Sequence, residues 1–331
     1  MGLLFLLFLV FLNCYTILMK NIPRVDLNDF LSNDSSLKQA FVNDLGKAFE
    51  NIGFVILKGH YLSNEQTDLL YREINAFFDL GEAQKRAYEI EGLAGQRGYT
   101  SFGKESAKGR TEGDLKEFWH FGQYRKKENG PIYPDNITVE QLPTFNTIGK
   151  EIFQTLEKTA QSILQAIALH LNLPEDYFDE YVAYGNSILR AIHYPPIKTA
   201  PINAVRAAAH GDINLITLLM GAQGKGLQVM TKEGDWIDAI AEEGELIINM
   251  GDMMARLTNN KLKSTLHQVV NPPKELWGTS RYSVPFFMHP SADMPLNCLD
   301  DCVSEAYPKA YEDCTAGEFL EERLKELGLK K

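Results

Sequence analysis

Three stretches in the first half of the chain place apolar residues every three or four positions, the spacing of one face of an α-helix. The first covers residues 37–52, and the second follows residues 63–66, whose Ser-Asn-Glu-Gln order is that of a capping box. The third covers residues 142–171 and predicts one long spine helix that packs against a sheet. We therefore expect residues 21–173 to form a largely helical N-terminal region.

The pattern changes after residue 173, where short apolar runs alternate with turn residues. Many short strands in succession are typical of a barrel or a jelly roll. We expect an α+β fold with a mainly β core, the jelly roll, over residues 174–290, and a C-terminal segment, residues 291–331, that contains an amphipathic helix. The expected strands are residues 54–57, 188–194, 214–220, 227–230, 236–240, 246–250, 265–270 and 282–288.

Residues 92–136 are rich in Gly, polar and aromatic residues and predict long loops. Loops of this kind often line the mouth of a binding site. Tyr99 and Trp119 are therefore candidates for contact with a substrate, with plain aromatic packing as the more common alternative.

The formal net charge of −11 argues against binding to nucleic acid, which relies on Lys and Arg to neutralise phosphates. Four cysteines are too few for a disulfide scaffold in 331 residues, so we expect reduced thiols and a cytoplasmic protein. Cys298, Cys302 and Cys314 lie close in the sequence to His289, which leaves a small zinc site as a minor alternative.

The chain begins with an unbroken apolar run over residues 3–12, and no charged residue precedes Lys20. A signal peptide normally carries a positive segment and a small-residue cleavage site, and neither is evident. The run is also at the short limit for a membrane span. We interpret residues 1–20 as an apolar tail or a misassigned start, with a membrane anchor through residues 3–19 as the alternative.

The candidate chemistry begins at His210 and Asp212, which stand two positions apart just before an apolar run that predicts a buried strand. Alternate residues of an extended chain point to the same side, so both side chains can bind one ion. His267, on another predicted strand, offers a third ligand. Two neutral imidazoles and one carboxylate form the facial triad of non-haem Fe(II) oxygenases. Each residue alone would more often be structural, so the prediction depends on the combination.

Arg281 and Ser283 follow on a β-patterned run, again two positions apart. An Arg fork beside a hydroxyl is suited to one carboxylate, and an Arg in so apolar a strand needs such a partner when it is buried. The stretch between His267 and Arg281 contains two prolines and Gly278 and predicts a hairpin loop.

His-Gly-Asp at 210–212, the distal His267, Arg-Tyr-Ser at 281–283 and Tyr194 in Ile-His-Tyr-Pro together resemble the isopenicillin N synthase-like family of Fe(II)/2-oxoglutarate-dependent dioxygenases. The resemblance spans residues 21–327 and is greater to bacterial than to plant members. It implies a distorted double-stranded β-helix flanked by helices. It also implies that His210, Asp212 and His267 bind Fe(II), and that Arg281, Ser283 and Tyr194 contact 2-oxoglutarate.

The reaction implied by the resemblance couples decarboxylation of 2-oxoglutarate, which yields succinate and CO₂, to the oxidation of a small-molecule substrate by O₂. The outcome can be hydroxylation, desaturation or ring closure. An Fe(II) oxidase of the same fold that uses no 2-oxoglutarate is the nearest alternative, and its Arg-x-Ser pair would hold a carboxylate of the substrate. A catalytically silent jelly-roll binding protein and a Zn- or Mn-dependent cupin are two further alternatives.

Arg206 and Asn214 are additional candidates for contact with the substrate. Positions 206, 208, 210 and 212 alternate along an extended strand, so Arg206 is expected on the face of both ligands, where it can meet an acidic group. A surface arginine is the more common alternative. Asn214 continues the same face and is expected to line the pocket.

Overall fold

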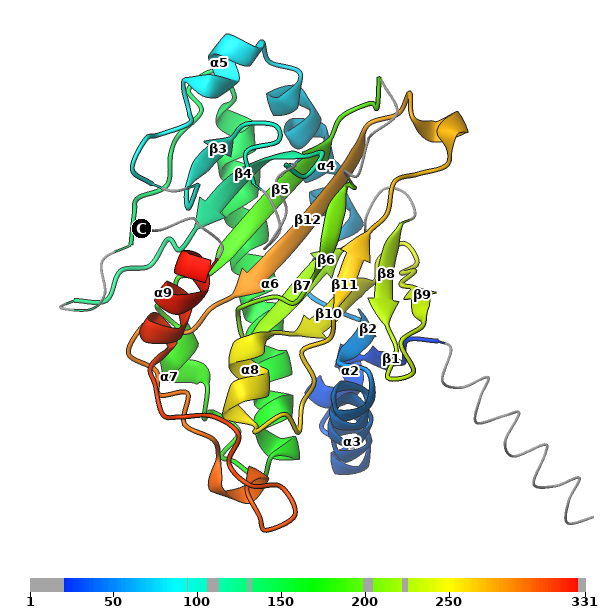
Figure 1. Cartoon of the computed structure of the whole chain (residues 1–331), viewed down its shortest axis with the longest axis vertical. Coiled ribbons are helices and arrows are strands. Elements are labelled where there is room, and N and C mark those ends of the chain that lie inside the picture. Colours follow the sequence, from blue (N-terminus) through cyan, green and yellow to red (C-terminus); the bar gives the residue numbers. More distant parts are fainter. Residues whose placement is uncertain are drawn as a thin grey trace, which may run out of the picture.

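Two β-sheets with helices around them make up the described part of the chain (Figure 1). The computed structural model describes residues 21–93, 95–105, 113–128, 130, 133–198, 205–221 and 226–326. Within these ranges no helix is both long enough and apolar enough to cross a bilayer. The apolar segment 1–20, with its tail and membrane-anchor interpretations, lies outside the described residues.

Among the described residues the larger sheet has eight strands, and most of the predicted strands belong to it. β1 pairs with β2 in parallel, and the other pairs are antiparallel. The predictions for residues 188–194 and 246–250 are confirmed at both ends. The order across the sheet is β1 (Arg24–Asp26), β2 (Phe54–Lys58), β10 (Leu246–Met250), β7 (Ile216–Met220), β12 (Arg281–Met288), β5 (Ile188–Tyr194), β4 (Glu117–Gly122) and β3 (Gly98–Thr100).

The smaller sheet has four strands and supplies the second layer of the jelly roll. Its order is β6 (Ala207–His210), β11 (His267–Val269), β8 (Leu227–Met230) and β9 (Trp236–Asp238). The predicted hairpin between β11 and β12 is wrong, because β11 pairs with β6 and β8 while β12 pairs with β5 and β7. The connection instead passes from one sheet to the other through the short 3₁₀ helix η1 (Lys274–Leu276).

The helices begin where capping residues satisfy the free amides of the first turn. The Ser63 hydroxyl accepts from the Gln66 amide, and the Gln66 side chain accepts from the Ser63 amide, which confirms the predicted capping box. Thr315 and Glu318 form the same reciprocal pair. The helices are α2 (Leu27–Leu31), α3 (Ser35–Asn51), α4 (Asn64–Phe78), α5 (Glu82–Arg86), α6 (Pro143–His170), α7 (Asp179–Val182), α8 (Asp252–Leu257), α9 (Ala316–Glu326) and the 3₁₀ helix η2 (Asp300–Cys302).

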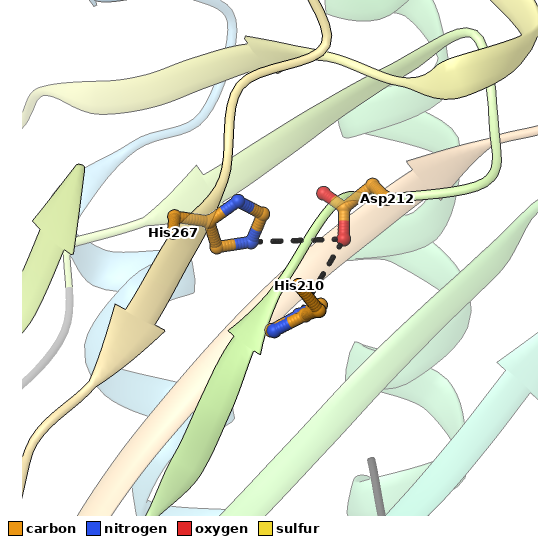
Figure 2. Close-up of side chains that lie close together, drawn as sticks. All are labelled: His210, Asp212 and His267. Atoms are coloured by element: carbon orange, nitrogen blue, oxygen red, sulfur yellow. Dashed lines mark ion pairs between the residues drawn. The ribbon is translucent and has the colours of Figure 1, made fainter. Parts of the chain in front are cut away.

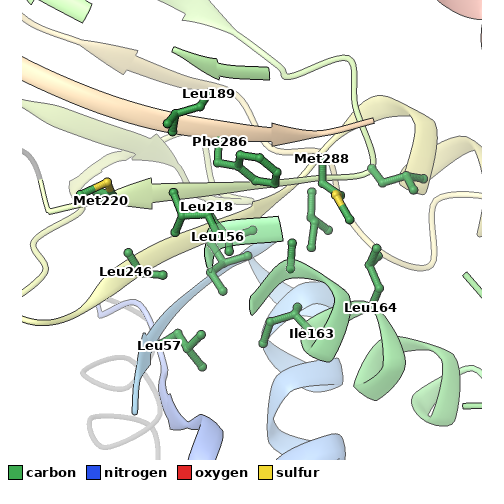
Figure 3. Close-up of a cluster of buried hydrophobic side chains, with 14 of the residues drawn as sticks. Leu57, Leu156, Ile163, Leu164, Leu189, Leu218, Met220, Leu246, Phe286 and Met288 are labelled. Atoms are coloured by element: carbon green, nitrogen blue, oxygen red, sulfur yellow. The ribbon is translucent and has the colours of Figure 1, made fainter. Parts of the chain in front are cut away.

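α6 is the predicted spine helix, and it packs along one face of the larger sheet (Figure 3). Its apolar stripe includes Leu156, Ile163 and Leu164, which are fully buried with Leu218 of β7 and Phe286 of β12. Removing this apolar surface from water is the main stabilising contribution to the arrangement, at about 25 cal/mol per Å². The long helix α6 therefore packs on the face of the larger sheet opposite the smaller sheet and holds its strands in place.

The other face of the larger sheet packs against the smaller sheet. Alternate residues of β2 point to opposite faces. Val55 and Leu57 join the cluster that contains α6, whereas Phe54 and Ile56 join a second cluster with Val229 of β8. The space between the two sheets is thus filled by side chains, as in a jelly roll.

The prediction of long loops over residues 92–136 is wrong in part, because this region contains β3 and β4. All six residues of β4 are buried, and β4 pairs with β5 along its whole length. Residues 117–122 read Glu-Phe-Trp-His-Phe-Gly, and such a nearly continuous aromatic run is typical of a strand that is buried on both faces. The predicted N-terminal region, residues 21–173, therefore contributes strands to the same sheet as the predicted core.

Candidate metal centre

His210 and His267 lie directly opposite each other on the adjacent antiparallel strands β6 and β11. Their ring centroids are 4.5 Å apart. The two residues are far apart in the sequence, and the strand pairing alone brings them together. Figure 2 shows both imidazoles directed toward the carboxylate of Asp212.

Asp212 completes a cluster of three potential metal ligands. Its Oδ1 is 3.9 Å from Nε2 of His210 and 3.7 Å from Nε2 of His267. One ligand atom from each residue lies within 4.8 Å of the other two, and among the described residues no other group of three His, Cys, Asp or Glu side chains meets this condition. Two imidazoles and one carboxylate on one side of a common centre are the donor set of a facial triad.

Backbone hydrogen bonds fix the turn that carries Asp212. β6 ends at His210, and the turn that follows is held by the start of α8, where the Asp252 amide donates to the Asp212 carbonyl at 2.7 Å. The Gly251 amide donates to the Leu215 carbonyl at 2.9 Å. A Cβ on Gly251 would lie 2.0 Å from the Asn214 carbonyl oxygen, so only glycine permits this close approach.

Each imidazole is oriented by a backbone carbonyl. Nδ1 of His210 is 2.7 Å from the Ala208 carbonyl, and Nδ1 of His267 is 3.2 Å from the Thr265 carbonyl. A carbonyl oxygen can only accept, so both Nδ1 atoms carry the proton and both Nε2 atoms present a lone pair to the centre. This is the tautomer that a metal ion requires of its histidine ligands.

The second oxygen of Asp212 is held by two neutral donors. Oδ2 accepts from the Thr217 hydroxyl at 2.6 Å and from the Asn249 amide at 2.8 Å. Burial alone would raise the pKa of Asp212, but His267, His210 and these two hydrogen bonds outweigh it, so the pKa is lowered. The carboxylate is therefore ionised, with Oδ1 left for a cation.

Thr217 and Asn249 were not identified from the sequence. The usable signal for Thr217 is a hydroxyl inside an otherwise apolar strand, which needs a buried partner. Asn249 is the fourth residue of the predicted strand β10, and a buried amide in an apolar strand gives the same signal. Asn214, expected to line the pocket, is fully buried and its amide donates to Thr217 and to the Ile216 carbonyl. It supports the ligand turn instead.

The site opens at His210. The side chain of His210 is 41% exposed, whereas those of Asp212 and His267 are 6% and 10% exposed. Desolvation of the ring by the protein atoms around it, in spite of its partial exposure, and the neighbouring His267 lower the pKa of His210, which keeps the ring neutral near pH 7. A neutral ring is again the form that binds a metal.

Arg281, Ser283 and Tyr194 lie together on the neighbouring strands β12 and β5. Arg281 is the register partner of Tyr194, and its guanidinium carbon is 5.1 Å from the centre of the Tyr194 ring. Arg281 is 3% exposed, and its Nε and Nη1 have no hydrogen-bond partner among the described residues. Ser283 is also buried. A buried guanidinium with free donors fits an anionic ligand that is not part of the chain.

Lys116, which directly precedes β4, connects the two halves of the site electrostatically, because it interacts with both His210 and Tyr194. It is buried, and its ammonium group lies 2.7 Å from Glu105 and 2.8 Å from Asp114. Its charge is thus compensated within the chain, in contrast to that of Arg281.

Tyr99 and Trp119 do not line the site, which corrects the interpretation of both as contacts of a substrate. Trp119 is fully buried, and its ring centroid is 4.9 Å from that of Phe77 and 5.4 Å from that of Phe145. Tyr99 is 1% exposed, and its hydroxyl donates to Glu117. Both residues belong to strands that pack under α4 and α6, because large aromatic rings contribute most when they are buried.

The thiols that suggested a zinc site do not form one among the described residues. Cys298, Cys302 and Cys314 are free, and the Cys298 thiol donates to the Arg256 carbonyl at 3.5 Å. Arg206, which we expected on the face of both ligands, is 3% exposed and is therefore not a surface arginine.

Comparison with known families agrees with this geometry. Residues 22–143 match the family described as the N-terminal part of the non-haem dioxygenase in morphine synthesis, and residues 185–290 match the 2OG-Fe(II) oxygenase superfamily. A 2-oxoglutarate-Fe(II) type oxidoreductase of Aspergillus fumigatus is 31% identical over 316 residues, which cover 92% of this chain and 92% of the relative.

Solved structures give the same result. A 2OG-Fe(II) oxygenase family protein from Caulobacter crescentus is 41% identical with a TM-score of 0.82, and the match covers 92% of this chain and 99% of that chain. A full-length Neurospora crassa protein in complex with alpha-KG is 30% identical with a TM-score of 0.81, over 92% of this chain and 95% of that chain. The chain therefore belongs to the 2OG-Fe(II) oxygenase superfamily, in its isopenicillin N synthase-like branch, and is an enzyme that uses Fe(II) and 2-oxoglutarate to oxidise its substrate.

Proposed function

We propose that His210, Asp212 and His267 bind the Fe(II) ion, and that Arg281, Ser283 and Tyr194 hold 2-oxoglutarate beside it. The observation that supports this proposal most strongly is the convergence of two Nε2 lone pairs and one carboxylate oxygen within 4.8 Å, with all three side chains oriented by hydrogen bonds from behind. A metal ion held by these three residues would keep further coordination positions for an oxo-acid and O₂.

The bound iron supplies the activation of O₂ that couples decarboxylation of 2-oxoglutarate to oxidation of the substrate. The chain contributes binding and orientation. Asp212 neutralises one of the two positive charges of the ion, and the carbonyl-bound imidazoles hold their ring planes fixed. Arg281 presents unpaired N–H donors in a dry environment, where a hydrogen bond to a carboxylate is strong. The Ser283 hydroxyl can add one donor to the same carboxylate.

The substrate is proposed to be a small organic molecule. The Neurospora crassa protein has also been solved with alpha-KG and thymine, and in that complex it is 29% identical to this chain with a TM-score of 0.80. The net charge of −11 supports a partner other than nucleic acid. We also propose a cytoplasmic location, which the three free thiols Cys298, Cys302 and Cys314 support.

Anaerobic titration tests these roles separately. The wild-type protein should bind one equivalent of Fe(II) and then 2-oxoglutarate, and His267→Ala should lose the metal. His60→Ala is the matched control, because His60 is outside the group of potential ligands and its Nδ1 accepts from the Leu62 amide in the loop after β2. Arg281→Gln should keep the metal but bind 2-oxoglutarate about 30-fold more weakly, because the loss of one partner of a buried charge pair costs about 2 kcal/mol or more.

Succinate formation tests the co-substrate. Wild-type protein that consumes O₂ without 2-oxoglutarate and forms no succinate would favour the oxidase alternative, in which Arg281 binds the substrate. Wild-type protein that consumes no O₂ with any oxo-acid would favour the silent binding protein. Unchanged affinity of Arg281→Gln for 2-oxoglutarate would contradict the role of Arg281.

A further inference from the structure

Arg206 is a second buried arginine beside Tyr194. It directly precedes β6, the strand that carries His210, and its guanidinium carbon is 5.6 Å from the centre of the Tyr194 ring. Arg281 lies 5.1 Å from the same ring centre. Arg206 lies just before a strand of the smaller sheet and Arg281 lies in the larger sheet, so two cations from different layers lie near one aromatic ring.

Arg206 has no anionic partner among the described residues. It is 3% exposed, and its Nε is buried without a hydrogen-bond acceptor. Burial and the nearby charge of Arg281 lower the pKa of Arg206 to about 10, so the group is charged near pH 7 and is repelled by its neighbour. An unpaired buried charge is costly, and proteins normally keep one only where a ligand compensates it.

Two other cations of this region, Lys116 and Arg190, are compensated by carboxylates of the chain. Lys116 contacts Glu105 and Asp114, and the Arg190 guanidinium lies 3.2 Å from Glu105. These two cations and two carboxylates balance each other. Arg206 therefore differs from Arg190 in its lack of a partner and not in its degree of burial alone.

A count of charges indicates what Arg206 can bind, and this step rests on the proposed function. Fe(II), the Asp212 carboxylate, the two carboxylates of 2-oxoglutarate and Arg281 together carry no net charge. The site is thus neutral once the metal and the co-substrate are bound. Arg206 then leaves one positive charge that neither a described residue nor the co-substrate compensates.

We propose that Arg206 binds a carboxylate of the substrate, and that the enzyme oxidises a small organic acid. The carboxylate would lie between Arg206 and the open side of the metal centre, which directs a C–H bond of the same molecule to the iron. Arg206 is in this view a binding residue that determines specificity for acids over neutral analogues.

Calorimetric titration with matched pairs of acid and amide tests the proposal. The protein is loaded with Mn(II), which does not start the reaction, and saturated with 2-oxoglutarate. It is then titrated with pairs such as phenylacetate and phenylacetamide or hexanoate and hexanamide. We expect the acids to bind at least tenfold more tightly than their amides. Arg206→Gln should abolish this preference and Arg206→Lys should retain part of it, with the affinity for 2-oxoglutarate unchanged within threefold in both variants.

Three results would overturn the proposal. The first is that the amides bind as tightly as the acids, and the second is that no member of any pair binds. The third is that Arg206→Gln lowers the affinity for 2-oxoglutarate by the same factor as Arg281→Gln. The last result would assign Arg206 to the co-substrate. Failure of the wild-type protein to bind 2-oxoglutarate at all is visible in the first titration and would count against the proposed function instead.

Thermal unfolding of the ligand-free protein provides a readout that needs no substrate. Replacing an unpaired buried charge with an apolar side chain removes the free-energy cost of desolvating that charge and its repulsion from Arg281. Arg206→Met should therefore raise Tm by about 2 °C or more, whereas Arg190→Met, which breaks a compensated pair, should lower it. A lower Tm for Arg206→Met would show that Arg206 is a structural residue and would overturn the proposal.

Discussion

The Thr217 hydroxyl donates a 2.6 Å hydrogen bond to Oδ2 of Asp212, while Oδ1 of the same carboxylate faces the two imidazoles. Thr217 lies on β7 and Asp212 lies in the turn before it. The strand that anchors the turn in the core therefore also selects which carboxylate oxygen is free. The orientation of a metal ligand depends on such a partner almost as much as on the ligand itself.

Thr217→Val should weaken metal binding. Valine keeps the size and branching of threonine but removes the donor, so Asp212 keeps only the Asn249 hydrogen bond. We expect about a 10- to 100-fold loss of affinity for Fe(II) or Mn(II). Competition with a chelator of known affinity measures it. Thr155→Val on the exposed side of α6 should have no effect, and equal affinities of the two variants would contradict the role of Thr217.

Gly251→Ala should disturb the metal centre through the backbone. The new Cβ would lie 2.0 Å from the Asn214 carbonyl oxygen, so the turn that carries Asp212 must shift. A cost of about 1–3 kcal/mol in the free energy of unfolding is expected, together with weaker metal binding. Denaturant unfolding and a metal titration measure the two effects.

Gly278→Ala is the control for this change, because no atom lies within 4 Å of the added Cβ and the residue is exposed. Gly278→Ala should leave the free energy of unfolding and the affinity for the metal nearly unchanged. Equal behaviour of the two alanine variants would show that the turn tolerates a side chain at Gly251.

Trp119→Ala should destabilise the fold without a specific effect on the site. Trp119 is enclosed by Phe77, Phe121 and Phe145, so its removal leaves a cavity in the core. The expected cost is about 3–5 kcal/mol in the free energy of unfolding. The affinity of the folded fraction for 2-oxoglutarate should remain that of the wild type. A large change in that affinity with little loss of stability would instead support the original interpretation of Trp119 as a site residue.

Glu117→Gln should destabilise the protein in a pH-dependent manner. Glu117 accepts from Lys85 at 2.7 Å and from His193 at 2.7 Å, and both Lys85 and Glu117 are buried. Burial alone would raise the pKa of Glu117, but His193, Lys85 and Tyr99 outweigh it, so the pKa is lowered. The variant leaves Lys85 without its buried charge partner, which costs about 3 kcal/mol at pH 7.

The sign of the pH dependence follows from the lowered pKa of Glu117. A carboxyl group whose pKa is lowered by folding stabilises the protein fully above its unfolded pKa, which is about 4.3 for Glu. This contribution is lost as the pH falls through the pKa of the folded state. The difference in the free energy of unfolding between wild type and Glu117→Gln should thus be constant above about pH 5 and should become smaller below it. Urea unfolding at several pH values measures it, with the exposed Glu91→Gln as control. A difference that widens on acidification would contradict this assignment.

Much of the fold followed from local rules. The features that were predicted each depend on residues that are near one another in the sequence. They are the Ser63–Gln66 and Thr315–Glu318 capping boxes, the apolar stripe of α6 and the strands β5, β8 and β10. β4 was missed because its buried polar residues, Glu117 and His120, are satisfied by partners elsewhere in the chain, and β3 has only three residues, one of them glycine.

The order of the residues alone shows which chemical groups are present, and the combination of His210, Asp212, His267 and the Arg281–Ser283 pair was sufficient to predict the family. Which of these groups meet depends on how the chain folds. The pairing of β6 with β11 brings His267 opposite His210. The register of β7 and β10 directs Thr217 and Asn249 to Asp212. The packing of the two sheets brings Arg206 close to the Tyr194 ring that Arg281 also contacts. Spacing along a strand fixes the direction of a side chain, but the partner of a buried polar group comes from a distant segment, and its position depends on how whole layers pack.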